Sequence, residues 1–118
     1  MLAGCGMTVS VPMFARAPSS AMHTARTEGF LILAGPCLLL RGPAGETTLL
    51  AWPFPGTRWN AARATLTVYG TEIRIGDHLV LGGGEFVSPA DPGEWVVPPA
   101  QLCWREQRWL VEAVVEVE

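Results

Sequence analysis

Glycine and proline interrupt the first apolar part of this chain so closely that a long helix cannot form there. A Gly-Pro pair at 35–36 separates the apolar run 30–33 from the run 37–40, and a Gly/Pro cluster at 42–45 precedes the segment 46–52. Proline lacks a backbone donor and glycine weakens a helix, so this spacing excludes a helix of about ten residues. The pattern predicts three short strands joined by tight turns.

Apolar and polar side chains alternate in most of the segments that follow. Alternation with a period of two is typical of strands that are buried on one face. In 65–69, for example, Leu66 and Val68 would share one face and Tyr69 would lie on the other. The alternating segments are 65–69, 73–75, 78–81 and 109–117, with glycine-containing turns at 70–71 and 76–77.

About seven short strands in a domain of about 90 residues predict an all-β fold. Small β domains avoid unpaired edge strands by closing on themselves. We therefore expect a small closed or nearly closed antiparallel barrel of the OB-like kind, with a two-sheet sandwich as the alternative. The barrel domain would span 28–118. Residues 1–27 are poor in charge and rich in Thr, Ser, Ala, Pro and Met, which predicts a flexible tether.

The segment Leu2-Ala3-Gly4-Cys5 matches the bacterial lipobox, in which the chain is cut before a cysteine that carries diacylglycerol. A signal peptide also needs a basic region and an apolar region before the cut, and only Met1 precedes the motif. Either the chain starts inside a longer signal or the match is chance. The first alternative predicts lipidation of Cys5, membrane attachment and a location on the periplasmic or extracellular face of the envelope. The second predicts a cytoplasmic protein.

Two further cysteines, Cys37 and Cys103, lie within the predicted barrel domain. In an oxidising compartment this even pair indicates one disulfide, and closing so long a loop would contribute about 4 kcal/mol in the chain-entropy model. In a reducing compartment they would instead be two separate buried thiols. The distance between the two cysteines tests the disulfide, because Cα atoms more than about 7 Å apart cannot be bridged.

The formal net charge is −3, and all eight basic residues are arginines. This balance argues against a phosphate-binding surface, so we expect no nucleic-acid partner. No segment reaches the roughly 18 consecutive apolar residues that a membrane-spanning helix needs. The charge and hydropathy patterns therefore favour a globular domain whose membrane attachment, if any, is through Cys5.

Short Gly/Pro-rich motifs recur through the predicted domain: Gly-Pro-Cys-Leu at 35–38, Trp-Pro at 52–53, Pro-Gly-Thr at 55–57, Ile-Gly-Asp at 75–77, Leu-Gly-Gly-Gly-Glu at 81–85, and Cys103 before Trp-Leu-Val at 109–111. Together they resemble a group of small uncharacterised bacterial lipoproteins and exported β-domain proteins. The resemblance covers residues 28–111. It implies export, a lipobox cysteine and a Cys37–Cys103 bridge, and it implies no known activity.

Aromatic residues are numerous for a small domain, and most of them should fill the core. The exception is the Pro-rich loop 52–59, which would hold rings at the barrel mouth, where they can stack on sugars, bases or partner side chains. We predict a binding surface formed by Trp52, Phe54 and Trp59 with Glu85. The glycines at 82–84 indicate a strand bulge or tight bend, since a phosphate-binding loop would also need a lysine and a helix.

His78 could act as a general base with Asp77 as the acid that orients it. No nucleophile signature accompanies the two residues. The preferred interpretation is therefore a turn at Asp77 beside a surface histidine. We predict no catalytic residue, metal site or cofactor. The preferred function is a non-enzymatic, lipid-anchored cell-envelope binding or scaffolding module, whose partner is an unknown envelope ligand or protein. The alternative is a cytosolic OB-like domain that binds single-stranded nucleic acid. A small hydrolase using Asp77 and His78 is the third hypothesis.

Overall fold

The computed structural model describes residues 8–15, 25–85 and 95–118, and within them it places ten strands and one short 3-10 helix. Most strands begin and end at the glycine and proline breaks seen in the sequence. The elements are β1 (Met13–Ala15), β2 (Ala25–Ala34), β3 (Cys37–Arg41), β4 (Thr47–Phe54), β5 (Thr57–Asn60), β6 (Thr65–Val68), β7 (Thr71–Arg74), β8 (His78–Glu85), β9 (Trp95–Val97), the 3-10 helix η1 (Gln101–Cys103) and β10 (Gln107–Val117).

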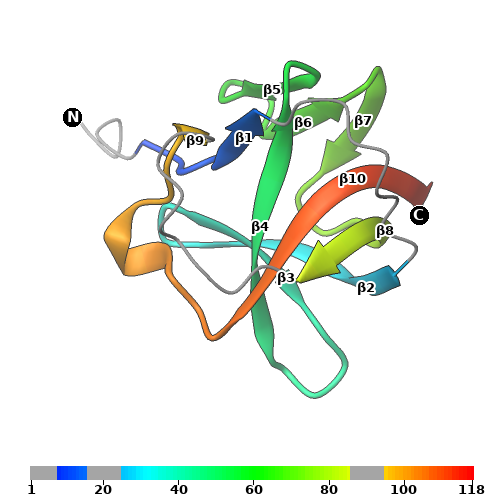
Figure 1. Cartoon of the computed structure of the whole chain (residues 1–118). Coiled ribbons are helices and arrows are strands. Elements are labelled where there is room, and N and C mark those ends of the chain that lie inside the picture. The colour runs from blue at the N-terminus through cyan, green and yellow to red at the C-terminus, as the bar shows by residue number, and fades with distance from the viewer. Residues whose placement is uncertain (1–7, 16–24, 86–94) are drawn as a thin grey trace.

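Five of these strands close into a barrel in the order β10-β8-β2-β3-β4 (Figure 1). All neighbours in this order are antiparallel, and a parallel pairing of β4 with β10 closes the ring. This confirms the predicted all-β, OB-like barrel, and the two-sheet sandwich is not what forms. The sequence underestimated the number of strands, because β1, β5 and β9 are three or four residues long and carry little alternation.

The barrel core is formed by every second residue of the closing strands. Leu38 and Leu40 of β3 point inward with Leu50 and Trp52 of β4, and all four are buried. The small sheet β5-β6-β7 closes one end of the barrel by adding Leu66, Val68 and Ile73 to the same cluster. The alternation of Leu66 and Val68 thus produced the inward face that the sequence predicted.

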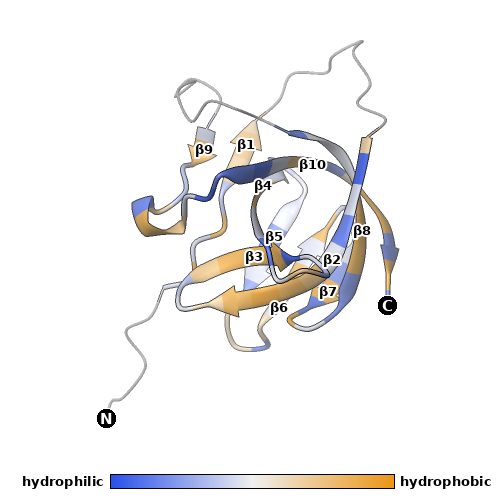
Figure 2. Ribbon diagram, turned by 90° about the horizontal axis from the view of Figure 1, so that it is seen from below, coloured by the Kyte–Doolittle hydropathy of each residue, from blue (hydrophilic) through white to orange (hydrophobic). Residues whose placement is uncertain are grey.

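The strand β3 is hydrophobic from Cys37 to Leu40, as its orange ribbon in Figure 2 shows, and all four of these residues are buried. Its outer face must therefore be covered as well as its inner one. Leu39 of β3 and Leu49 of β4 are paired neighbours that point away from the barrel core, yet both are buried. Residues 95–106, here called the strap, pack over them through Ala100, Cys103 and Trp104. The outer face of β3 and β4 is therefore a second, smaller core.

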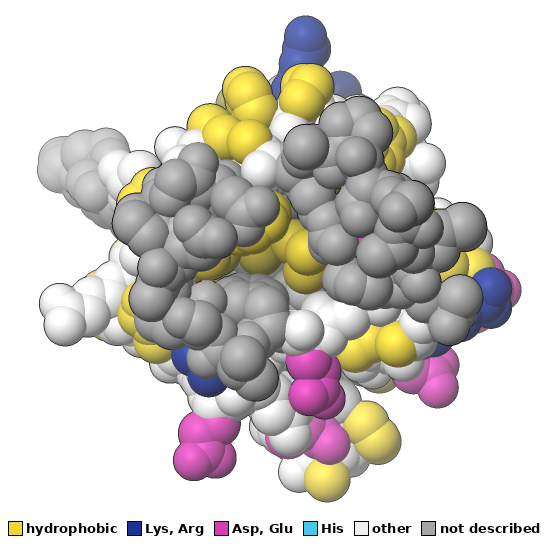
Figure 3. Space-filling model, viewed as in Figure 1, with side chains coloured by type: hydrophobic (Ala, Val, Ile, Leu, Met, Phe, Trp, Pro, Cys, Tyr) yellow, Lys and Arg dark blue, Asp and Glu magenta, His cyan; other side chains and the backbone are white. Residues whose placement is uncertain are grey.

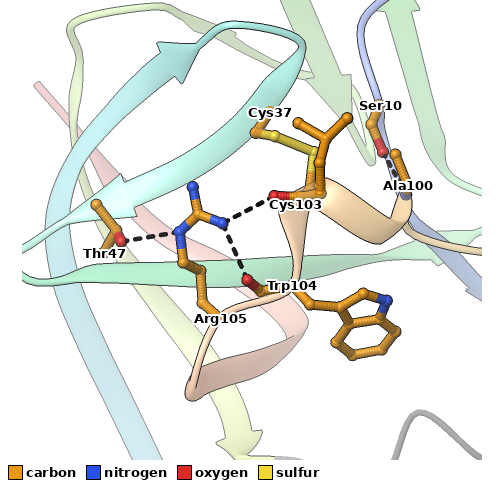
Figure 4. Close-up of a disulfide and its surroundings, with 8 residues drawn as sticks. Ser10, Cys37, Thr47, Ala100, Cys103, Trp104 and Arg105 are labelled. Atoms are coloured by element: carbon orange, nitrogen blue, oxygen red, sulfur yellow. Dashed lines mark hydrogen bonds between the residues drawn. A yellow bond between two sulfur atoms is a disulfide. The ribbon is translucent and has the colours of Figure 1, made fainter.

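A disulfide between Cys37 and Cys103 fastens the strap to the start of β3 (Figure 4). The two Cα atoms are 5.3 Å apart, so the predicted bridge is confirmed. Arg105 adds hydrogen bonds: its Nε donates to Thr47 Oγ1 at 3.3 Å, and its guanidinium also donates to the carbonyls of Leu102 and Trp104 (Figure 4). The disulfide at Cys103 and the hydrogen bond from Arg105 to Thr47 thus hold the same part of the strap, two residues apart.

Part of the segment expected to be tether lies against the barrel. Val11 is buried, β1 pairs in parallel with the end of β4, and the backbone N–H of Ser10 donates to the carbonyl of Pro36 at 2.7 Å. The strap joins this contact, since Ala100 N–H donates to Ser10 Oγ at 3.1 Å. Residues 8–15 therefore contribute to the fold, whereas Cys5 lies outside the described residues.

Candidate recognition surface

The structure separates the three aromatic residues that the sequence placed in one binding loop. Trp52 is completely buried in the barrel core, so a surface ligand cannot reach it, which corrects the prediction for this residue. Trp59 is half-buried and packs against the same core. Phe54 is 43% exposed, and it is the only one of these three residues that is classed as exposed. Trp52 is buried because β4 extends through residue 54, so alternation continues into the Pro-rich segment.

Tyr69 is the exposed aromatic residue that sequence reasoning missed as a binding candidate. Its side chain is 63% exposed, and its backbone lies in the left-handed region with φ of 48°. A two-residue hairpin turn of type I′ requires positive φ at both of its central residues, and Tyr69 and Gly70 are these residues between β6 and β7. The signal was present in the sequence, since alternation already placed Tyr69 on the outward face, opposite Leu66 and Val68.

Phe54 and Tyr69 lie at two adjacent turns at the same end of the small sheet. The register pairs Thr57 with Val68 and Val68 with Thr71, so the turn before β5 and the turn between β6 and β7 are neighbours. The backbone N–H of Tyr69 donates to the carbonyl of Gly56 at 2.7 Å and joins the turns directly. We call Phe54, Pro55, Gly56 and Tyr69 the turn-pair surface.

The Tyr69 ring lies directly against the backbone of Gly56, which has no side chain to keep the ring away. A Cβ atom there would lie 2.5 Å from Tyr69 Cε1, which means that the ring rests directly on the glycine backbone. Gly56 also has φ of 129°, a conformation that glycine adopts without strain. The ring is therefore positioned before any partner arrives, and binding need not order it.

A polar strand face adjoins the turn-pair surface. Arg58, Thr67 and Glu72 are register partners on β5, β6 and β7, so their side chains form one row across the sheet. Arg58 and Glu72 are exposed, and the ion pair between Glu72 and Arg74, at 3.5 Å, is too exposed to add much stability. Figure 3 shows hydrophobic side chains gathered with basic side chains at the end of the molecule where Figure 1 places β5 and β6. The region therefore combines exposed rings with planar hydrogen-bonding groups.

Glu85 is not brought to these rings. It ends β8 and pairs with Trp109 of β10, and Figure 1 places this end of β8 away from β5 and β6. A bulge does lie beside the preceding glycines, but its extra residue belongs to β10: Val111 pairs with Gly83 and Ala113 with Gly82, which makes Glu112 the additional residue. The glycine run therefore shapes the barrel wall and is not adjacent to the turn-pair surface.

Asp77 and His78 point to different partners. The Asp77 carboxylate accepts the backbone N–H of Arg74 at 2.8 Å, which stabilises the turn between β7 and β8. His78 packs edge to face on Phe30, with ring centroids 5.1 Å apart, and its Nε2 lies 3.5 Å from Glu28 Oε2. The carboxylate beside the imidazole is thus that of Glu28.

Searches of protein-family models, curated proteins and solved structures found no match to this chain. Its topology nevertheless defines a class, the OB-like barrels, which bind oligonucleotides and oligosaccharides on the face that corresponds to β3 and β4 and on the flanking loops. In the described residues, no helix has the length and apolarity needed to cross a membrane, and no cluster of three His, Cys, Asp or Glu side chains has metal-site geometry.

Proposed function

We propose that this chain is a non-enzymatic, lipid-anchored binding or scaffolding module of the cell envelope, and that the turn-pair surface contacts its envelope ligand or partner. The observation that carries the proposal is the exposure of Phe54 and Tyr69, 43% and 63%, with the Tyr69 ring resting on Gly56. Rigid exposed aromatic residues are strong contact residues, because they provide large contact areas at little cost in conformational entropy.

The disulfide supports the envelope location. Disulfides persist in oxidising compartments and are uncommon in the cytosol. Both cysteines are 1% exposed, and the bridge fastens a segment that has little regular structure of its own, so the bridge has a structural role. The lipobox at Cys5 supports membrane attachment and adds to the same proposal.

The nucleic-acid alternative rests on the OB-like topology, and two observations weigh against it. The strap covers the outer face of β3 and β4, which is the face that OB-like barrels use for oligonucleotides. The net charge is −3, whereas single-stranded nucleic acid is bound along basic grooves. The turn-pair surface lies at the end of the small sheet, outside the region that the strap covers.

Attachment is tested by expressing the gene with its native upstream region in the presence of a clickable palmitate analogue. We expect the label on Cys5, with the protein in the membrane fraction, and Cys5→Ala should lose the label and become soluble. Cys37→Ser/Cys103→Ser is the control, because both of these cysteines are in the disulfide and their removal should not affect labelling. Labelling that persists in Cys5→Ala would show that this site is not the anchor.

Recognition is tested with the soluble Cys5→Ala protein and purified envelope fragments in a sedimentation assay. The double variant Phe54→Ala/Tyr69→Ala should pellet about tenfold less, since contact aromatics commonly contribute more than 1 kcal/mol each. Leu102→Ala is the matched control, because Leu102 is 66% exposed on η1 and lies outside the turn-pair surface. Equal sedimentation of the double variant and the wild type would exclude this surface.

A further inference from the structure

A second polar and aromatic cluster lies on the outer wall of the barrel. The register of β2 pairs Phe30 with Arg41 on β3 and with His78 on β8, so these three residues form one row across three adjacent strands. Phe30 is 44% exposed, which places the row on the outside of the barrel. Glu28, two residues before Phe30 on β2, lies on the same face.

These side chains line a shallow depression of about 190 Å³, together with Gly29 and Pro43. Phe30 and Pro43 supply apolar walls. The Phe30 ring is fixed by its edge-to-face contact with His78, and His78 is held in turn beside Glu28. The volume corresponds to roughly one large amino-acid side chain, which is below the usual size of drug-like pockets.

Arg41 supplies a solvent-exposed guanidinium to this depression. In the described residues no hydrogen bond, ion pair or ring stacking engages its guanidinium, whereas the Glu28 carboxylate already has the imidazole of His78 beside it. A guanidinium binds a planar carboxylate through two parallel hydrogen bonds. The depression therefore offers an oxyanion contact next to an apolar wall.

The chemistry of the lining favours a carboxylate over a phosphate. Glu28 lies in the same depression, and its charge repels a dianion about twice as strongly as a monoanion. The Glu28 oxygen that His78 does not occupy can accept a hydrogen bond from an amine or amide N–H. An apolar side chain, a carboxylate and a nearby N–H are the three features of an amino acid or of a peptide's last residue.

We propose that this depression binds an apolar residue ending in a free carboxylate. Arg41 holds the carboxylate, Phe30 and Pro43 contact the side chain, and Glu28 accepts the ligand's N–H. This site is independent of the turn-pair surface, so either proposal can fail without the other.

The test is a nitrogen-15 NMR titration of the full chain with N-acetyl-phenylalanine, compared with its carboxamide. We expect saturable shifts at Phe30, Arg41 and His78 with the acid, and binding of the amide weaker by about tenfold, as for the loss of a charge-assisted hydrogen bond. Absence of shifts at these residues up to about 10 mM acid, or equal binding of the amide, would overturn the proposal.

Variants and further ligands test the role of Arg41, the preference for a carboxylate and the source of the ligand. Arg41→Gln should weaken binding of the acid by about tenfold. Arg63→Gln is the control, because Arg63 is also exposed but lies in the turn before β6, and it should leave binding unchanged. Phenyl phosphate should bind more weakly than the acid, and tighter binding of phenyl phosphate would contradict the argument from Glu28.

Free phenylalanine and a short peptide ending in phenylalanine distinguish the two sources of the ligand, because the source that binds more tightly is the one that the depression fits.

Discussion

Single residues decide the local geometry of this barrel most clearly at Gly83. Its φ is 151°, and a Cβ atom there would collide with the carbonyl oxygen of Leu110 on the neighbouring strand. The adjacent Gly82 has more room, since a Cβ there would meet its nearest heavy atoms at 3.7 Å, an ordinary contact distance. Glycine is therefore required at position 83 and not at position 82.

We predict that Gly83→Ala lowers the free energy of unfolding by about 3 kcal/mol or more, because the clash is with backbone and cannot be relieved by a side-chain rotation. Gly82→Ala should change it by less than about 1 kcal/mol. Urea unfolding of both variants measures the difference. Similar stabilities for the two variants would mean that β8 does not approach β10 as closely as described.

The Gly56→Ala variant tests the support of Tyr69. The new methyl group would displace the Tyr69 ring and strain a positive φ, so we expect a loss of about 1–3 kcal/mol and faster motion of the ring in NMR spectra. Gly45→Ala is the matched control, since Gly45 also has positive φ but has nothing within 4 Å of its Cβ position. A loss no greater than that of Gly45→Ala would show that the ring does not rest on Gly56.

Among the elements, the strap is the one whose position depends most on a covalent bond. Its 3-10 helix is three residues long, and its contacts with β3 and β4 are the small cluster around Leu39 and Leu49. The aromatic contacts of Trp104 with Trp95 and with the Arg108 guanidinium, 6.4 Å and 5.6 Å from its ring centre, support the same segment. A short segment of this kind gains little stability from its own hydrogen bonds.

We expect the double variant Cys37→Ser/Cys103→Ser to lose about 2–5 kcal/mol of stability. Because Leu39 and Leu49 would then be exposed, the variant should also bind a hydrophobic dye more strongly and lose hydrogen-exchange protection first in residues 95–106. Arg105→Gln with the disulfide intact should show a smaller change in the same residues. Unchanged stability and exchange in the double variant would show that packing alone holds the strap.

The elements also show what the sequence can and cannot predict here. The strand at 37–40 follows from an apolar run between Gly/Pro breaks, and those at 65–68 and 78–81 follow from alternation and glycine turns. The cysteine pair was predicted from its even count. The burial of Trp52 was missed because proline at 53 suggested a loop, whereas β4 continues to residue 54 at a position where β1 is its neighbour. The exposure of Tyr69 and the depression at Phe30 depend on which strands become neighbours, which periodicity does not encode.

At the scale of the whole molecule, covering the OB-like face changes what the fold can bind. We predict no saturable binding of a single-stranded oligothymidine at low salt, with an affinity weaker than about 1 mM, because the face is covered and the net charge is −3. Fluorescence anisotropy with a labelled oligonucleotide measures this. Micromolar binding that weakens steeply with salt would instead favour the cytosolic nucleic-acid-binding alternative.

The closure of the barrel by the parallel pairing of β4 with β10 has a consequence for the order in which the protein is made. Until residues 107–117 have left the ribosome, β4 lacks one neighbour and β8 lacks another, so the nascent chain has two open sheet edges. The barrel therefore completes only after its latest strand has been synthesised. Under the proposed export, the barrel would stay open until β10 is available to pair with both β4 and β8.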